Sequence, residues 1–227
     1  MKGSQLHLRN YVNNHSSLLN KAIFSCSTSL LSFVRGELNI EWKSPLMEDG
    51  YKEYQDDFLT LYFNNVNESS KATKDIRQYW PAKGPVWDGV GIVKGQEQTG
   101  LVLVEAKAHT GETYSKIKAT SNESISKITD TLKIAQHEFR SNSSIDPWLE
   151  EYYQLSNRLA FLHILNDKLN IPTWLVLVNF KGDETYIKTS KEEWLSHYSH
   201  VFETLDIKHD SKMLSNVCMV YLPGLSV

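Results

Sequence analysis

Three charged residues near the middle of the chain have the types and spacing of a hydrolytic site. The segment LVLVEAKAH, residues 101–109, is otherwise apolar, yet it carries Glu105 and Lys107 two positions apart, and Asp88 precedes it in GPVWDGVGIV. Two converging carboxylates make the all-oxygen ligand set that Mg²⁺ uses, and a metal there lowers the pKa of a bound water. A neighbouring lysine can orient that water or stabilise the transition state. The set suits phosphodiester hydrolysis with Mg²⁺ or Mn²⁺.

A β-hairpin would bring these residues together. The sequence predicts one strand over about residues 86–93, a polar turn at KGQEQTG, and a second strand over GLVLVEAKAH. Residues two apart on a strand face the same side, so Glu105 and Lys107 project together while the alternate valines enter a core. Asp88 reaches the same face if the register sets it opposite Glu105.

The same residues also fit an edge hairpin with a solvated Glu–Lys pair, a common and weak arrangement. Short motifs alone are not specific. Two features favour the site. The strand around Glu105 and Lys107 is otherwise apolar, which argues against a freely solvated face, and a Gly-Pro turn lies just before Asp88.

Pro85, Asp88, Glu105 and Lys107 resemble the PD-(D/E)XK nuclease signature of the restriction-endonuclease-like fold, in its glutamate version. Two residues separate the proline from the aspartate, which departs from the family pattern. The wider strings IEWKSPL, YKEYQDDFL, WPAKGPVWDGVG, LVLVEAKAH and YYQLSNRLAFL are similar to a bacterial group of such nucleases, over roughly residues 40–180. The resemblance implies a restriction-endonuclease-like core and the layout of its active site, more than a substrate.

The resemblance also implies a further acid on a helix before the hairpin. The segment YKEYQDDFLTLYFNN is expected to form that helix, with an apolar stripe that includes Tyr51, Tyr54 and Phe58. Glu53 lies beside the stripe and is the candidate third metal ligand. A solvated acidic helix start explains these residues equally well. The competing acids nearby are Glu48, Asp49, Asp56 and Asp57.

Three further residues are secondary candidates. A long helix is expected to begin at Asp146-Pro147, and it carries Gln154 and Arg158 on one face. Related nucleases place a helix glutamine near the metal, although a hydrogen-bonding cluster between helix and sheet is the other interpretation. His109 shares the face of Lys107 if the strand persists, and there it would contact a phosphate or assist proton transfer; a plain strand-end histidine is the alternative.

The remaining pattern predicts an α/β fold, with a mixed central β-sheet flanked by helices. One domain is expected over residues 1–227, with residues 1–40 as an N-terminal helical extension. The other expected elements are a helix over residues 16–35, an extended ELNIEWKSPL, a helix over 125–139, a buried strand TWLVLVNF, a helix KEEWLSHYSHVFETL and a strand NVCMVYLP.

The composition narrows the class of protein. The chain has 227 residues and a formal net charge of −3, which argues against coating nucleic acid by bulk charge. Local lysines and an arginine on both sides of the hairpin would form a basic rim, and a solvated charged surface explains the same residues equally well. The two distant cysteines and the lack of an apolar leader or membrane span favour a reduced, cytoplasmic protein. The rim candidates are Lys71, Lys74, Arg77, Lys83, Lys116, Lys118, Lys127 and Lys133.

The leading hypothesis is a metal-dependent nuclease. Asp88, Glu105 and Glu53 would bind the metal, and Lys107 would act on the water or the transition state. Nucleic acid is the expected partner, DNA being favoured over RNA, and no membrane is expected. The alternatives are a catalytically inactive nucleic-acid-binding or assembly module of the same fold, and a metal-dependent hydrolase of small phosphate esters.

Overall fold

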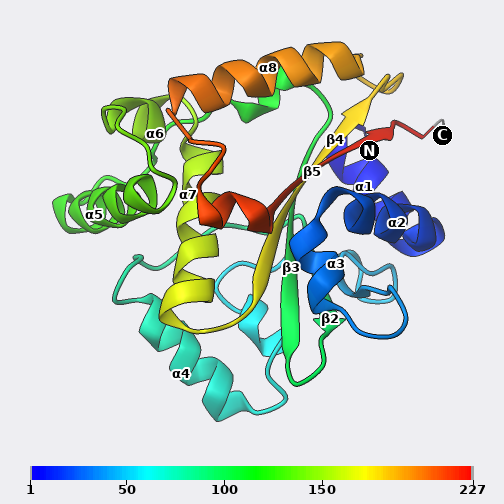
Figure 1. Cartoon of the computed structure of the whole chain (residues 1–227), viewed down its shortest axis with the longest axis horizontal. Coiled ribbons are helices and arrows are strands. Elements are labelled where there is room, and N and C mark those ends of the chain that lie inside the picture. Colours follow the sequence, from blue (N-terminus) through cyan, green and yellow to red (C-terminus); the bar gives the residue numbers. More distant parts are fainter. Residues whose placement is uncertain (1, 226–227) are drawn as a thin grey trace.

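A five-stranded mixed sheet forms the centre of the molecule (Figure 1), in a computed structural model that describes residues 2–225. The spatial order is β1-β2-β3-β4-β5; the first three strands are antiparallel, and β3, β4 and β5 are parallel. The strands are β1 (Glu41–Ser44), β2 (Gly89–Lys94), β3 (Thr99–Lys107), β4 (Thr173–Lys181) and β5 (Val217–Pro223). The central strand β3 is therefore paired along both edges, as its apolar sequence predicts.

Helices cover both faces of the sheet (Figure 1). The α-helices are α1 (Ser4–Asn14), α2 (Ser16–Cys26), α3 (Thr28–Phe33), α4 (Val66–Ile76), α5 (Asn122–Glu138), α6 (Asp146–Glu150), α7 (Tyr153–His163) and α8 (Lys191–Thr204). Short helical turns are η1 (Phe58–Leu61), η2 (Thr110–Thr113), η3 (Ile164–Lys168, a π-helix) and η4 (Lys212–Asn216). The prediction of an α/β fold with a mixed sheet flanked by helices is confirmed.

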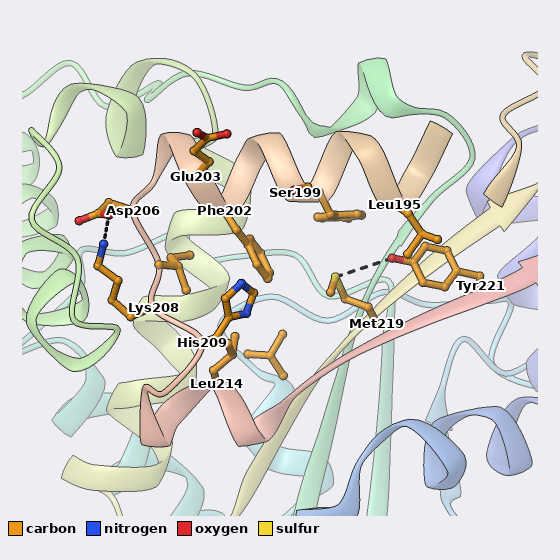
Figure 2. A pocket seen from close by; sticks show the side chains of 13 residues that line it. Leu195, Ser199, Phe202, Glu203, Asp206, Lys208, His209, Leu214, Met219 and Tyr221 are labelled. Carbon is orange, nitrogen blue, oxygen red and sulfur yellow. Dashed lines mark hydrogen bonds and ion pairs between the residues drawn. The ribbon is translucent and has the colours of Figure 1, made fainter. Parts of the chain in front are cut away.

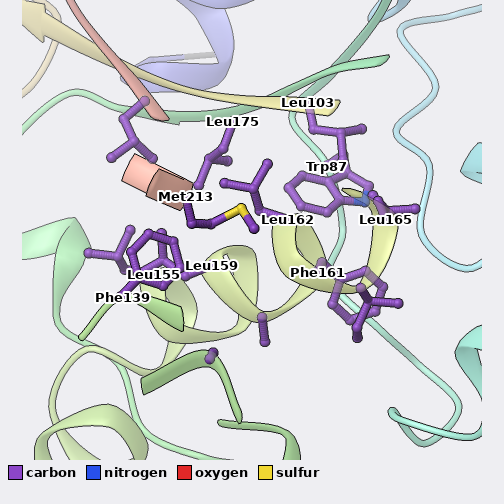
Figure 3. Close-up of a cluster of buried hydrophobic side chains, with 14 of the residues drawn as sticks. Trp87, Leu103, Phe139, Leu155, Leu159, Phe161, Leu162, Leu165, Leu175 and Met213 are labelled. Carbon is purple, nitrogen blue, oxygen red and sulfur yellow. The ribbon is translucent and has the colours of Figure 1, made fainter. Parts of the chain in front are cut away.

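Alternation along β3 divides the core into two layers. Leu101 and Leu103 face α4 to α8, whereas Val102, Val104 and Ala106 face α1 to α3. The helices of the expected N-terminal extension thus close one whole face of the sheet. Figure 3 shows part of the other layer, where Trp87, Leu103, Phe161 and Leu162 pack between the sheet and α7.

Two expected helices are each divided in the structure. The helix predicted over residues 16–35 breaks at Ser27, whose hydroxyl accepts from Leu30 N (3.2 Å) and so begins α3. The helix predicted from Asp146 breaks after α6, because Ser115 pairs with this segment: Ser115 N donates to Glu151 O (2.7 Å) and Tyr153 N donates to Ser115 O (3.1 Å). The helical periodicity of a segment gives no information about capping side chains or about main-chain pairing with distant residues.

The helix predicted over residues 51–65 is wrong. Only the η1 turn is helical there, and Tyr51 has a left-handed backbone with φ of 60°. Trp87 N donates to Tyr54 O (2.8 Å), so the main chain at Tyr54 is extended and bridges the segment before β2. Tertiary pairing has overridden an amphipathic pattern, and Glu53 lies on an irregular segment as a result. Helix α4 follows, in a region for which no helix was predicted.

Candidate functional site

The register of the β2–β3 hairpin places Asp88 opposite Glu105. Gly89 pairs with Val104, and one step further back Asp88 N donates to Val104 O (3.1 Å). The carboxylate then turns toward β3, where its Oδ2 accepts from Ala106 N (2.8 Å). The expected condition for the two acids to share a face is therefore met.

Glu105 is the centre of a buried charge cluster. Its side chain is 5% exposed, and the Lys107 ammonium contacts its Oε1. Arg158, from α7, donates to its Oε2 through Nε (2.7 Å). Arg158 also donates to Val86 O and to Asn157 Oδ1, both at 2.7 Å. Burying this carboxylate costs desolvation energy, and the cations paired with both of its oxygens offset that cost.

The two acids have different protonation behaviour. Burial, reinforced by the charge of Glu105, raises the pKa of Asp88 to about 7. Burial also opposes ionisation of Glu105, but Arg158 and Lys107 outweigh it and hold the pKa of Glu105 below its usual range. Glu105 is thus ionised at neutral pH, while Asp88 titrates there. Neighbouring carboxyl groups whose pKa values are shifted in opposite directions are typical of functional sites, although structural ion pairs produce the same effect.

A pocket of about 920 Å³ lies beside this cluster. Its wall includes the predicted residues Glu53, Asp88, Gln154 and Arg158. Glu105 lies behind the wall. Asp88 also borders an adjoining hollow of about 490 Å³, which is lined by Lys107 and by the N-terminal residues of α1. Asp88 is therefore the residue at which the pocket and the lysine meet.

Glu53 reaches the pocket from its irregular segment and is held by α1. Gln5 Nε2 donates to its Oε1 (2.9 Å), and Arg9 Nη2 lies 3.9 Å from the same oxygen. Its competitor Asp56 has a structural role, because it accepts from Lys83 N (2.9 Å) and Gly84 N (2.8 Å). Sequence reasoning missed the contribution of α1, although Gln5 and Arg9 are spaced four residues apart and so share one helix face.

The other secondary candidates have separate positions. Gln154 lines the pocket, and its backbone N–H donates to Ser115 Oγ (2.7 Å). His109 lies beyond the end of β3, so the strand does not persist far enough to place it on the face of Lys107. Its ring lies 5.4 Å from that of Tyr186, and its Nε2 is 3.6 Å from Glu112 Oε1.

Part of the predicted basic rim borders the pocket. Lys83, Lys116 and Lys118 line it and are exposed. Other members are used elsewhere: Arg77 pairs with Asp56, and Lys71 pairs with Asp75 at 2.7 Å. The exposed trio gives the pocket wall positive charge.

The tightest potential metal-binding group lies elsewhere in the described residues. Ligand atoms of Glu138, His163 and Asp167 all lie within 4.8 Å of one another, at the ends of α5 and α7 and on η3. His163 Nδ1 is 2.9 Å from Asp167 Oδ2. The three predicted acids do not gather this closely in residues 2–225.

A third hollow, of about 570 Å³, lies between α8 and the β5 edge of the sheet. Figure 2 shows its mainly apolar lining, with Phe202, Leu214 and Met219 facing one another and the Asp206–Lys208 ion pair at one end. It contains none of the predicted site residues.

Comparison with family models, with curated proteins and with solved structures gave no match. Within residues 2–225, every helix is too short or too polar to cross a bilayer.

Proposed function

We propose that the chain is a metal-dependent nuclease with a restriction-endonuclease-like core, acting on DNA in preference to RNA. One observation carries the proposal: the hairpin register sets Asp88 opposite Glu105, with Lys107 beside them and a lysine-rimmed pocket in front. This arrangement is what the resemblance to PD-(D/E)XK nucleases implies. An apolar strand could have formed without an aspartate opposite Glu105.

The donor set suits a hard divalent cation. Among the described residues, Asp88 Oδ1 has no hydrogen-bond partner, and the residue borders the pocket. Glu105 Oε1 contacts one cation, Lys107, and keeps a second lone pair, whereas Oε2 is approached by two nitrogens of Arg158. With both acids ionised, Glu105, Asp88, Lys107 and Arg158 carry no net charge. A divalent ion is then best accommodated together with an anionic phosphate, as Mg²⁺ usually is.

The residues of the chain would divide the work. Asp88 and Glu105 would hold Mg²⁺ or Mn²⁺, and Glu53, which lines the same pocket as Asp88, would complete the set. The bound ion would supply an acidified water and charge neutralisation at the phosphoryl group. Lys107 would orient that water or stabilise the negative charge of the transition state. Lys83, Lys116 and Lys118 would contact flanking phosphates.

A second candidate is a non-catalytic nucleic-acid-binding module, and one observation favours it. Both oxygens of Glu105 are already held, by Lys107 and by Arg158, as in a structural ion-pair cluster. In that case Glu105 fastens α7 to the sheet, and the pocket binds phosphates without cleaving them.

The deciding experiment compares wild type, Lys107→Ala and Lys94→Ala. Lys94 is an exposed lysine at the end of the neighbouring strand β2 and serves as the matched control. Each protein is incubated with single-stranded DNA, duplex DNA and RNA in Mg²⁺, Mn²⁺ or EDTA. We expect cleavage by wild type and Lys94→Ala that EDTA abolishes and Lys107→Ala lacks. Binding without cleavage in every condition would favour the module, and cleavage of RNA alone would overturn the DNA preference.

A further inference from the structure

The two cysteines, far apart in the sequence, meet on the face of the sheet opposite the Asp88 pocket. Cys26 ends α2 and is exposed, whereas Cys218 lies in β5 and is fully buried. Cys26 Sγ donates to Met219 O (3.1 Å), the carbonyl next to Cys218. Cys218 Sγ lies 3.6 Å from Ile23 O, less than one helical turn before Cys26. Each thiol therefore lies against the main chain beside the other.

The thiols have unequal acidities. A hydrogen bond from the Cys218 thiol lowers the pKa of Cys26 to about 7 and outweighs the opposing effect of burial. The same hydrogen bond, together with burial, raises the pKa of Cys218. The titratable groups that interact with Cys26 are Cys218 and Tyr221, both on β5. At neutral pH Cys26 thus has substantial thiolate character and is accessible, which are the two conditions for reactivity.

We propose that Cys26 and Cys218 are a peroxide-reactive thiol pair that closes to a reversible intramolecular disulfide. The oxidant class is a hydroperoxide, either hydrogen peroxide or an alkyl hydroperoxide. This site is separate from the proposed nuclease chemistry and uses none of its residues.

The reaction balances in two steps. The Cys26 thiolate attacks the terminal peroxide oxygen, the O–O bond breaks, and the remaining oxygen leaves with a proton as water or an alcohol. Cys26 becomes a sulfenic acid. Cys218 then loses its proton and attacks the Cys26 sulfur; the S–S bond forms, the S–O bond breaks, and the hydroxyl group leaves with a proton as water. Two thiols lose two electrons in total, and the hydroperoxide gains them.

The alternative is that Cys218 serves only as a small apolar side chain in the core layer beneath α2. That role accounts for Cys218 but leaves the exposed Cys26, and its thiol contact, unexplained. A disulfide here would tie α2 to the edge strand β5.

The test exposes the native full chain to hydrogen peroxide and follows intact mass and non-reduced peptide maps. Wild type is compared with Cys26→Ser, Cys218→Ser and urea-unfolded wild type. We expect native wild type to lose two hydrogen atoms, to yield a cross-linked Cys26–Cys218 peptide, and to recover with dithiothreitol. Cys218→Ser should instead gain one oxygen at Cys26, trapped by dimedone. Cys26→Ser should stay unmodified over the same exposure.

Three results would overturn the proposal. The first is that the Cys26–Cys218 disulfide forms no faster in the native chain than in urea. The second is that intermolecular dimers form in place of the internal disulfide. The third is that Cys26→Ser is oxidised as much as wild type. None of these readouts depends on nuclease activity, so the thiol pair and the proposed function stand or fall separately.

Discussion

Arg158 approaches Glu105 with two of its guanidinium nitrogens, Nε at 2.7 Å and Nη2 at 2.6 Å from the same carboxylate oxygen. Both side chains are almost completely buried, at 3% and 5% exposure. The pair joins α7 to β3 within the core layer to which these two elements otherwise contribute leucines such as Leu103 and Leu162. It also stacks Arg158 over Trp87, with the guanidinium carbon 4.9 Å from the ring centroid. One ion pair therefore fixes the helix that forms one wall of the pocket.

Arg158→Ala should lower the free energy of unfolding by about 3–5 kcal/mol, because it leaves Glu105 buried with Lys107 as its remaining cation. Arg158→Lys should recover only part of this loss, since an ammonium cannot reproduce the contacts to Val86 O and Asn157. Urea denaturation measures each variant. The double variant with Glu105→Gln should cost less than the sum of the single changes; strict additivity would show that the pair is not coupled.

Asp88→Asn should stabilise the protein at alkaline pH. In an unfolded chain the pKa of an aspartate is about 3.9, whereas the pKa of Asp88 in the fold is about 7. The folded state therefore binds the Asp88 proton more tightly, and wild-type stability falls as pH rises from about 4 to about 7. The advantage of Asp88→Asn should grow across this window to roughly 2 kcal/mol, since a half-buried carboxyl realises only part of the shift. Urea midpoints of both proteins at each pH check it; a constant difference would contradict the assignment.

If Asp88 is a metal ligand, a divalent cation should reduce or reverse the stability advantage of Asp88→Asn over wild type at alkaline pH. A cation that binds only the folded wild type stabilises it by mass action, and at pH 8 the carboxylate is ionised. Adding Mn²⁺ or Mg²⁺ should raise the melting temperature of wild type and leave Asp88→Asn unchanged. Thermal denaturation at fixed ionic strength measures both. Equal shifts in the two proteins would place the metal away from Asp88.

Substituting alanine at Lys83, Lys116 and Lys118 should weaken DNA binding and flatten its salt dependence. Each lost contact with a duplex phosphate reduces the slope of log K against log salt by about 0.9. Fluorescence anisotropy with Ca²⁺ in place of Mg²⁺ would measure binding over a salt series. The matched control changes three exposed lysines outside the pocket, Lys21, Lys168 and Lys212. An identical slope for both triple variants would show that the pocket rim does not contact the phosphates.

Gly91→Ala should destabilise the β1 edge by about 1–3 kcal/mol, the usual cost of overpacking. A methyl group at Gly91 would overlap Ile40 Cγ2 and lie 3.4 Å from the Trp42 ring. Ile40→Ala removes the overlapping atom, so the double variant should lose less stability than the two single changes together. Chemical denaturation of the four proteins completes this cycle. Additive losses would place the strain elsewhere.

Much of the sheet and the heart of the candidate site could be predicted from the sequence. Strand alternation is a local property, so the shared face of Glu105 and Lys107 and the opposite direction of Val102 and Val104 follow directly. The polar turn between apolar runs implied the hairpin, and the hairpin implied that Asp88 could face Glu105. The buried strand Thr173–Lys181 and the last strand Val217–Pro223 were also predicted.

The remainder depends on contacts that no local pattern contains. Glu53 was expected on a helix, yet Tyr54 pairs with Trp87 and the segment is extended there. Arg158 was a secondary candidate that shares a helix face with Gln154, with a hydrogen-bonding cluster between helix and sheet as the alternative. Its pairing with Glu105 depends on how α7 crosses the sheet. The contact between Gln5 and Glu53 joins segments that only the three-dimensional fold brings together.

The packing of α1 and α2 against the far end of the chain sets an order for folding during translation. Tyr11 donates to Pro223 O (3.1 Å), and His7 Nε2 lies 2.9 Å from Asp183. Helices α1 and α2 precede the sheet in the sequence, and until β4 and β5 have been made only β1, β2 and β3 are available for them to cover. Nascent chains that stop before residue 217 should leave one core layer open, a target for chaperones and proteases.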